Sequence, residues 1–302
     1  MHSIIKRPLE ATLASRIVSS VSKQRVKGKR LILAYHGIIP DGAAPAGERS
    51  LFITQRQFAA QLDMLCEIAD VAPLDRIDDD GNGRPRVAIT LDDAYKGAVC
   101  EGVAELVKRK LPATIFVASS FLGGRVFWWD ALSTLNGAMD DGVREYALNS
   151  LAGSEGRVRH WASSAGLAMS DDLPDYARSA TIAELRAAVQ HPEITLGSHT
   201  SSHRNLARLD IAEIVSEVTQ SRAVLKSHFG PRVIDWLAYP YGLDSIAARH
   251  AVAAAQYVGA LRVEGGWHSA KRTSPYARPR LNVSSEWSVA RLKAHAVGAL
   301  LS

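Results

Sequence analysis

Two adjacent carboxylates are the first residues in this 302-residue chain whose types and spacing suit catalysis. Asp92 and Asp93 end the apolar run 86–91, and neighbouring side chains at the end of a strand point in different directions. One carboxylate can therefore bind a cation while the other stays free to accept a proton. An isolated pair of aspartates is more often a helix cap or a turn, so this interpretation needs support from a second cluster.

The second cluster is the histidine pair His199 and His203, which follows the apolar run 194–196. Histidines four residues apart share a face of a helical turn and can offer imidazole nitrogens to one metal ion. The spacing alone is weak evidence, because such pairs also arise by chance. A carboxylate from another strand end, such as Asp93, would complete a three-ligand site with an open position for water.

Two further polar clusters also follow predicted strands. In one, Tyr239, Pro240 and Tyr241 form a turn whose rings could line a pocket for a sugar, although aromatic rings beside proline are often only packing. In the other, Tyr35 precedes His36, which is a candidate acid or substrate contact and, taken alone, is more often a structural histidine.

The rest of the sequence predicts an α/β fold that gathers these clusters at one end of a barrel. Short β-rich runs alternate with amphipathic helices, which is typical of parallel strands joined by crossover helices, and active-site residues of such barrels follow the strand ends. The seven predicted strands are 31–35, 86–91, 113–118, 193–198, 234–239, 257–261 and 280–283. The predicted helices are 55–68, 97–110, 211–229 and 243–255.

Two segments lie outside this alternation. Residues 127–190 contain no convincing strand, so we expect a helical insertion in a barrel domain that spans 30–302; long connections of this kind usually carry function. Trp129 near its start could stack on a sugar ring, although adjacent tryptophans are as often a hydrophobic clasp. Residues 1–29 predict a basic amphipathic helix that either packs on the domain or lies on an anionic membrane surface.

The composition indicates a globular protein with a small excess of positive charge. Lys and Arg number 36 against 31 Asp and Glu, most of the excess precedes residue 31, and we expect no nucleic-acid partner. Two cysteines suggest neither a disulfide framework nor a cysteine metal site, and no apolar run is long enough for a signal-peptide core or a membrane span. We therefore expect a cytoplasmic protein, with the inner face of the membrane as an alternative.

The order of the four clusters along the chain and their residue sequences resemble the polysaccharide deacetylase family, also called the NodB-homology domain. The family's Thr-Phe-Asp-Asp motif is matched by 90–93, with Leu91 in place of the aromatic residue, and its His-Ser/Thr-x-x-His motif is matched by 199–203. The opening 33–38 also looks like the beginning of this family. The resemblance covers 31–283 and implies the irregular (β/α) barrel of the NodB-homology type.

The resemblance also implies an activity, namely removal of the acetyl group from an N-acetylated sugar. Asp93, His199 and His203 would hold a divalent ion, usually Zn²⁺, with Co²⁺, Ni²⁺ or Mn²⁺ as alternatives. Asp92 would be the base that takes a proton from water, and the backbone N–H of Tyr241 would help the ion to hold the oxyanion.

The sequence departs from the family pattern in two places. Ala238 stands where the third motif begins with an arginine that braces the base, so Arg280 is a candidate brace from another strand. The family's late Leu-x-His motif is not found at a strand end, which leaves His36 and His268 as candidates for the general acid. The candidate substrate contacts are Tyr35, Trp129, Tyr239, Pro240 and Arg280.

Three functions fit the sequence. The first is N-deacetylation of a glycan or glycan precursor for surface or exported polysaccharide in a bacterium, with a nucleotide-linked or lipid-linked sugar as the cytosolic substrate. The second is hydrolysis of another C–N bond, in a cyclic imide or amide. The third is carbohydrate binding without catalysis, which gives no chemical reason to keep both aspartates and both histidines together.

Overall fold

The centre of the fold is a sheet of nine strands in the part of the chain that the computed structural model describes, residues 26–81, 83–133, 137–269 and 271–300. The strands are β1 (Arg30–Tyr35), β4 (Asp70–Val71), β5 (Arg86–Leu91), β6 (Ala113–Val117), β7 (Ile194–Ser198), β8 (Val233–Ala238), β9 (Gly259–Arg262), β10 (Arg278–Pro279) and β11 (Leu281–Asn282). They pair in the order β10-β9-β8-β7-β6-β5-β1-β11, with β4 beside β5, and every pairing is parallel. Their carboxyl ends therefore meet at one end of the fold.

The two edges of this sheet are joined by a single residue. β10 pairs with β9 at one edge and β11 pairs with β1 at the other, yet only Arg280 separates β10 from β11 in the chain. The sheet is thereby nearly closed into a barrel, and the Arg280 side chain is buried at the seam.

The predicted barrel is confirmed, with a different number of strands. All seven predicted strands are present, with ends that differ by at most two residues from 31–35, 86–91 and their successors. The pattern missed β4 and β10, which have two residues each; β11 is as short, but it lies inside the longer predicted run 280–283. A separate parallel pair, β2 (Gly37–Ile39) and β3 (Phe52–Thr54), follows β1.

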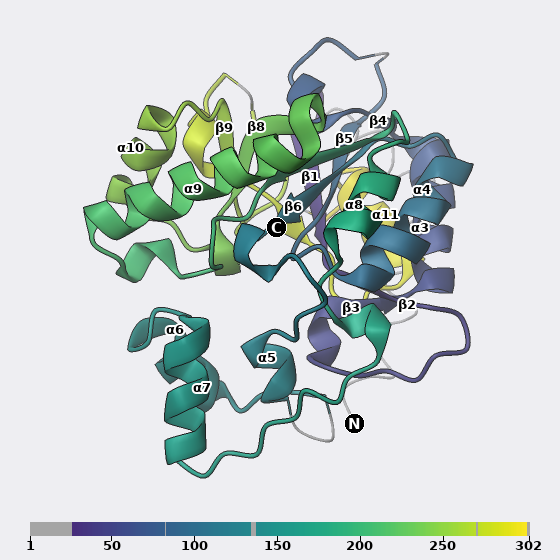
Figure 1. The fold of residues 1–302 in the computed structure, drawn as a ribbon. Helices are drawn as coiled ribbons and strands as arrows, with labels where there is room; N and C mark the ends of the chain where they lie inside the picture. Colours follow the sequence, from purple (N-terminus) through teal and green to yellow (C-terminus); the bar gives the residue numbers. More distant parts are fainter. Residues whose placement is uncertain (1–25, 82, 134–136, 270, 301–302) are drawn as a thin grey trace.

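Helices that connect the strands cover the outside of the barrel (Figure 1). α3 (Gln55–Ile68) begins at Thr54, whose hydroxyl accepts a hydrogen bond from a first-turn N–H, and α9 (Ile211–Phe229) begins with a capping box between Asp210 and Glu213. Both helices have the predicted bounds. The other α-helices that the structure describes outside the insertion are α4 (Val103–Lys108), α10 (Ile246–Ala254) and α11 (Val289–Ala296). The predicted helix 97–110 is a π-helical turn, Ala98–Gly102, followed by α4.

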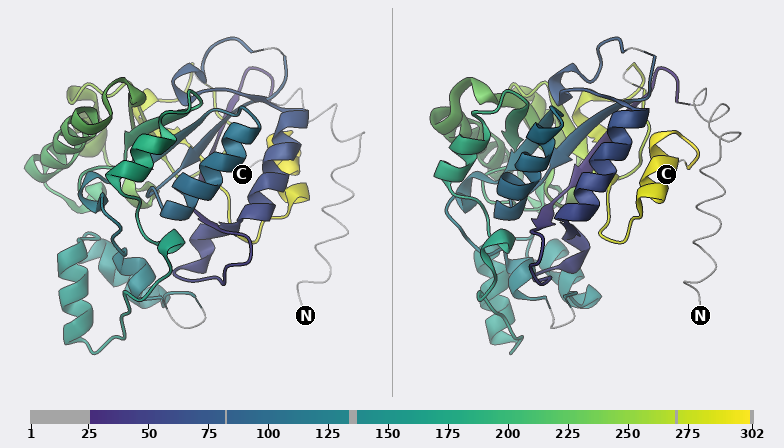
Figure 2. Two further views of the ribbon diagram at one scale, coloured as in Figure 1. Left: turned by 45° about the vertical axis from the view of Figure 1, so that its right-hand side comes forward. Right: turned by 90° about the vertical axis from the view of Figure 1, so that its right-hand side faces the viewer.

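The segment 127–190 folds as helices, and no described residue in it belongs to a strand. Its helices are α5 (Trp128–Ala131), α6 (Asp141–Asn149), α7 (Glu155–Ser164) and α8 (Ile182–Ala188). Figure 1 shows α5, α6 and α7 as a group below the barrel, at the end where β2 and β3 lie, and the turned views in Figure 2 keep this group at the same end. The group therefore stands over the carboxyl ends of the strands.

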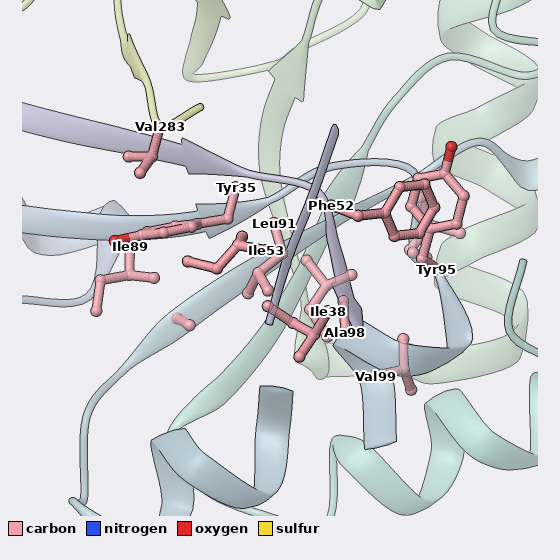
Figure 3. Packing of buried hydrophobic residues seen from close by; sticks show 14 of the residues in the cluster. Tyr35, Ile38, Phe52, Ile53, Ile89, Leu91, Tyr95, Ala98, Val99 and Val283 are labelled. Atoms are coloured by element: carbon pink, nitrogen blue, oxygen red, sulfur yellow. The ribbon is translucent and has the colours of Figure 1, made fainter. Parts of the chain in front are cut away.

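A hydrophobic core fixes β1 and β5 against the helices. Figure 3 shows Tyr35 beside Ile89 from the neighbouring strand, and Phe52 packed against Tyr95 with ring centroids 4.8 Å apart. Burial of each such side chain stabilises the fold by about 1.5–3 kcal/mol. The strands that carry the first polar clusters are therefore rigidly held.

The basic amphipathic helix predicted for 1–29 lies outside the described residues, apart from a turn at 26–28. Among the helices that the structure describes, none combines the length and the apolar character that a membrane crossing requires.

Candidate active site

The loops after four strands meet in one cavity of about 210 Å³. Asp92 and Asp93 follow β5, and His199 and His203 follow β7, with β6 between these strands in the sheet. The structure thus brings together the four residues on which the sequence prediction depended. The described residues that line the cavity are His36, Leu51, Asp92, Asp93, Trp128, Trp129, Arg144, Leu148, His199, His203, Tyr241, Gly242, Val263 and Asn282.

Asp93, His199 and His203 present three ligand atoms to one point. Asp93 Oδ1 lies 3.4 Å from His199 Nε2 and 3.1 Å from His203 Nε2, and the two Nε2 atoms are 3.1 Å apart. His199 Nδ1 donates to the carbonyl of Ala238 at 2.8 Å, so the lone pair of Nε2 faces the other two atoms. Asp93 Oδ1 is buried without a hydrogen bond of good geometry. Three electron-rich atoms at such distances fit a shared cation.

The electrostatic environment keeps both aspartates ionised. Burial acts to raise the pKa of Asp92, but the positive charge and hydrogen bonds of Arg280 outweigh it and the pKa is lowered. Burial likewise acts to raise the pKa of Asp93, but the close contacts with His199 and His203 outweigh it and the pKa is lowered. Burial lowers the pKa of His203, which favours the neutral form that binds a metal.

Asp92 is held by a bidentate ion pair with Arg280. Arg280 Nη1 donates to Asp92 Oδ1 at 2.7 Å and Nη2 donates to Oδ2 at 2.6 Å, while Nη1 also contacts Thr90 Oγ1 at 3.2 Å. Asp92 Oδ2 lies 3.8 Å from His199 Nε2, so the oriented carboxylate stands beside the three ligand atoms. The arginine missing at Ala238 is replaced by one from the barrel seam.

The prediction that Arg280 contacts substrate is wrong. Its side chain is 1% exposed, does not line the cavity, and directs both terminal nitrogens to Asp92. Geometry therefore makes Arg280 a brace for the carboxylate.

Three other predicted substrate contacts also lie away from the cavity. Tyr35 is fully buried and donates its hydroxyl to Gln61 of α3, because alternation along β1 turns it toward the helix. Tyr239 is buried and donates its hydroxyl to the carbonyl of Tyr276. Pro240 is buried in the turn and does not line the cavity. These three predictions are wrong.

The two candidate general acids are far apart. His36 follows β1 and lines the cavity; burial lowers its pKa, against the charges of Asp92 and Asp93. His268 pairs through its backbone with Arg30, at the beginning of β1 and thus at the opposite end of the barrel. His268 is therefore excluded as an acid for this cavity.

Aromatic rings from the insertion form one wall of the cavity. The ring of Trp129 lies 4.7 Å from that of His203, and the ring of His203 lies 4.7 Å from that of Tyr241, centroid to centroid. Trp128 Nε1 donates to the Tyr241 hydroxyl at 3.2 Å. The predicted contact Trp129 thus reaches the cavity, where it also packs against a candidate metal ligand.

Several loop residues of the site adopt left-handed backbone conformations. The φ angles are 66° at Asp93, 66° at Thr200, 56° at His203 and 59° at Tyr241. Each costs about 1–3 kcal/mol in a residue other than glycine, and such strain persists where the surrounding structure enforces it, often at active sites. Strain therefore gathers in the three loops that carry these side chains.

Five lining residues were not anticipated from the sequence, and we call them the mouth of the cavity because each is more exposed than the buried aspartates and histidines. They are Leu51, Arg144, Leu148, Val263 and Asn282. The four-residue spacing of Arg144 and Leu148 places both on one face of α6, which was a usable signal only if the position of the insertion was known.

Comparison with known proteins identifies the family. The sequence model described as polysaccharide deacetylase matches residues 79–260, more than half of the chain, and the chain belongs to the polysaccharide deacetylase family. This family comprises hydrolases that act on acetylated carbohydrates, and it is generally metal-dependent. A search among curated protein sequences gives no match.

Three solved structures illustrate the shared fold. The deacetylase PplD of Streptococcus pyogenes, in complex with acetate, is 16% identical with a TM-score of 0.62, over 89% of this chain and 99% of that one. IcaB of Ammonifex degensii is 16% identical with a TM-score of 0.60, over 89% and 97%. A de-N-acetylase of Aggregatibacter actinomycetemcomitans is 13% identical with a TM-score of 0.61, over 88% and 99%. At these identities the likeness concerns the fold.

Proposed function

We propose that this protein is a metal-dependent N-deacetylase that hydrolyses the acetamide of an N-acetylated sugar in a glycan or glycan precursor. The observation that carries the proposal is the convergence of Asp93, His199 and His203 on one point, with the oriented carboxylate of Asp92 beside it. Zn²⁺ suits two imidazoles and one carboxylate with an open position, and Co²⁺, Ni²⁺ and Mn²⁺ accept similar ligands.

The reaction breaks the amide C–N bond and yields acetate and a free amine. When bound, the ion would supply Lewis-acid polarisation of the acetyl carbonyl and acidify water. Asp92 is charged, fixed by Arg280 and therefore oriented to accept the proton of the attacking water.

Two further groups complete the proposed machinery. The backbone N–H of Tyr241 is the candidate donor to the oxyanion, because Tyr241 lines the cavity next to His203. His36 lines the same cavity and is the candidate that returns a proton to the leaving amine.

We also propose that the enzyme works in the cytoplasm, at the inner face of the membrane, on a lipid-linked or nucleotide-linked sugar for surface or exported polysaccharide. Cys66 and Cys100 are free, which suits a reducing compartment. The basic segment 1–29 suits an anionic membrane surface.

The test is release of acetate from N-acetylglucosamine and its oligomers by the zinc-loaded protein. We expect release that stops when a chelator removes the metal and returns when zinc is added. Parallel assays with a cyclic imide separate the proposal from its nearest alternative. Turnover of the imide, with no acetate from any sugar, would contradict the proposed function.

A further inference from the structure

The insertion places a permanent positive charge at the mouth of the active-site cavity. Arg144 and Leu148 lie one helical turn apart in α6, and both line the cavity. Among the described lining residues, Arg144 is the one arginine or lysine. Its side chain is 38% exposed, whereas Asp93 is 4% exposed. Arg144 is therefore far more accessible to solvent than the buried carboxylates of the same cavity. We call the buried residues Asp92, Asp93, His199 and His203 the floor of the cavity.

Glu48 fixes the orientation of this arginine. Glu48 is buried, and its Oε2 accepts a hydrogen bond from Arg144 Nη2 at 2.8 Å and from the N–H of Met139 at 3.1 Å. Its Oε1 accepts a hydrogen bond from the Ser50 hydroxyl at 2.8 Å. A carboxylate with three donors is held in place, so it holds the guanidinium in place as well.

This contact leaves most of the donors of Arg144 unused. Of its three guanidinium nitrogens, Nε and Nη1 have no acceptor among the described residues. The carboxylates on the floor already have partners, because Arg280 pairs with Asp92, and His199 and His203 adjoin Asp93. The unused donors of Arg144 are therefore the available partners for a negatively charged group of a ligand.

We propose that Arg144 is a specificity-determining residue that binds an anionic group of the sugar, so that the preferred substrates are acidic N-acetylated sugars. The inference rests on the proposed function and names its substrate class. A carboxylate and a phosphate both present oxygen atoms that match the guanidinium fork, and such charge-assisted hydrogen bonds are roughly twice as strong as neutral ones.

The experiment compares three sugars that share one acetamide, with the zinc-loaded full-length protein. The probes are N-acetylglucosamine, N-acetylglucosamine 1-phosphate and N-acetylglucosaminuronic acid. We expect kcat/KM for acetate release to be roughly 10- to 100-fold higher on at least one acidic sugar than on the neutral one, as expected for a hydrogen bond to a charged group. The phosphate and carboxylate arms distinguish the two sources of the charge.

Variants assign the preference to Arg144. Arg144→Gln should lower kcat/KM on the preferred acidic sugar at least about tenfold more than on the neutral sugar, and Arg144→Lys should recover part of the difference. Arg157→Gln removes the same charge from an exposed position in α7 that does not line the cavity, and it should leave the preference unchanged.

Two results would overturn the inference: equal kcat/KM of the unaltered protein on all three sugars, or an equal loss on all three in Arg144→Gln. Failure of the proposed function gives a different result, namely no acetate from any sugar. In that case, calorimetric titration of the zinc-loaded protein with the three sugars still decides, because equal or absent binding of the acidic sugars contradicts the role of Arg144.

Discussion

The floor and the wall of the cavity are built from different parts of the chain and in different ways. The floor consists of Asp92, Asp93, His199 and His203, which are nearly fully buried and follow central strands of the barrel. The insertion supplies part of the wall and of the mouth, through Trp128, Trp129, Arg144 and Leu148 on short helices.

Under the proposed function, this division separates reaction from recognition. Strand ends are fixed by hydrogen bonds and by the core between them, so they hold reacting groups within tenths of an ångström. An insertion can change in sequence without disturbing the barrel, and thus can alter the substrate. Substitutions in the floor should therefore affect the chemistry on every substrate, whereas substitutions in the mouth should affect the choice among substrates.

The largest effect is expected for Asp92→Asn on the floor. An amide cannot accept the proton of water, so kcat should fall about 10²–10⁴-fold on neutral and acidic sugars alike. Bound zinc, measured by elemental analysis, should be retained because the three candidate ligands are unchanged. Asp172→Asn removes an exposed carboxylate from the insertion and serves as the control. Activity of Asp92→Asn within threefold of the unaltered protein would exclude Asp92 as the base.

The next effect concerns the brace. Arg280→Met leaves the buried Asp92 carboxylate without its partner, which should lower the free energy of unfolding by about 3–5 kcal/mol, measured with urea. Arg222→Met breaks a partly exposed ion pair with Asp235, which keeps Lys226 as a second partner, and should cost at most about 1 kcal/mol. The pKa of Asp92 should also rise, which moves the acidic limb of the pH–activity profile to higher pH. An equal loss of unfolding free energy in the two variants would contradict the role of Arg280 as a partner that stabilises the Asp92 carboxylate.

A smaller effect is expected for metal affinity. His203→Ala removes one of the three candidate ligands, and zinc should bind at least about 100-fold more weakly, since even loss of a supporting residue costs 10- to 100-fold. His191→Ala, an exposed histidine, is the matched control. An unchanged zinc affinity in His203→Ala would contradict the assignment of the site.

The barrel could be predicted because its signals are local. The apolar runs 86–91 and 194–196 lie within single strands, and the caps at Thr54 and Asp210 lie at the first turns of single helices. The strands β4 and β10 could not be predicted, because each has two residues and neither lies in a longer β-rich run that was recognised. The position of Arg280 depends on closure of the whole sheet. The sequence therefore could not decide whether Arg280 orients Asp92 or contacts substrate.

The floor of the site could be predicted because its residues are adjacent or four apart, and because strand ends converge in a parallel barrel. The mouth could not, since its residues come from distant segments. Gly153 shows the difficulty: a Cβ there would lie 2.7 Å from the Tyr241 hydroxyl, so a glycine in the insertion permits close approach to a loop of the barrel. Nothing in the neighbouring sequence indicates this contact.

The last comparison is between the carboxylates of the floor and the buried carboxylate of the insertion. The pKa values of Asp92 and Asp93 are lowered, so both stay ionised from acidic to alkaline pH. Burial raises the pKa of Asp130 from 3.8 to about 7, although hydrogen bonds from the Glu48 N–H and the Tyr95 hydroxyl oppose the rise. The insertion, unlike the floor, should therefore change its charge near neutral pH.

The sign of the effect on stability follows from proton linkage. Between about pH 4 and pH 7 the folded protein retains the proton of Asp130 and the unfolded chain releases it, so stability falls as pH rises through this window. Asp130→Asn cannot titrate, and its free energy of unfolding should depend less steeply on pH, by at most about 1.4 kcal/mol per unit. Urea unfolding at several pH values checks this, with Asp172→Asn as the control. If the two variants show the same slope, Asp130 is ionised like the floor, and the electrostatic difference between the two regions disappears.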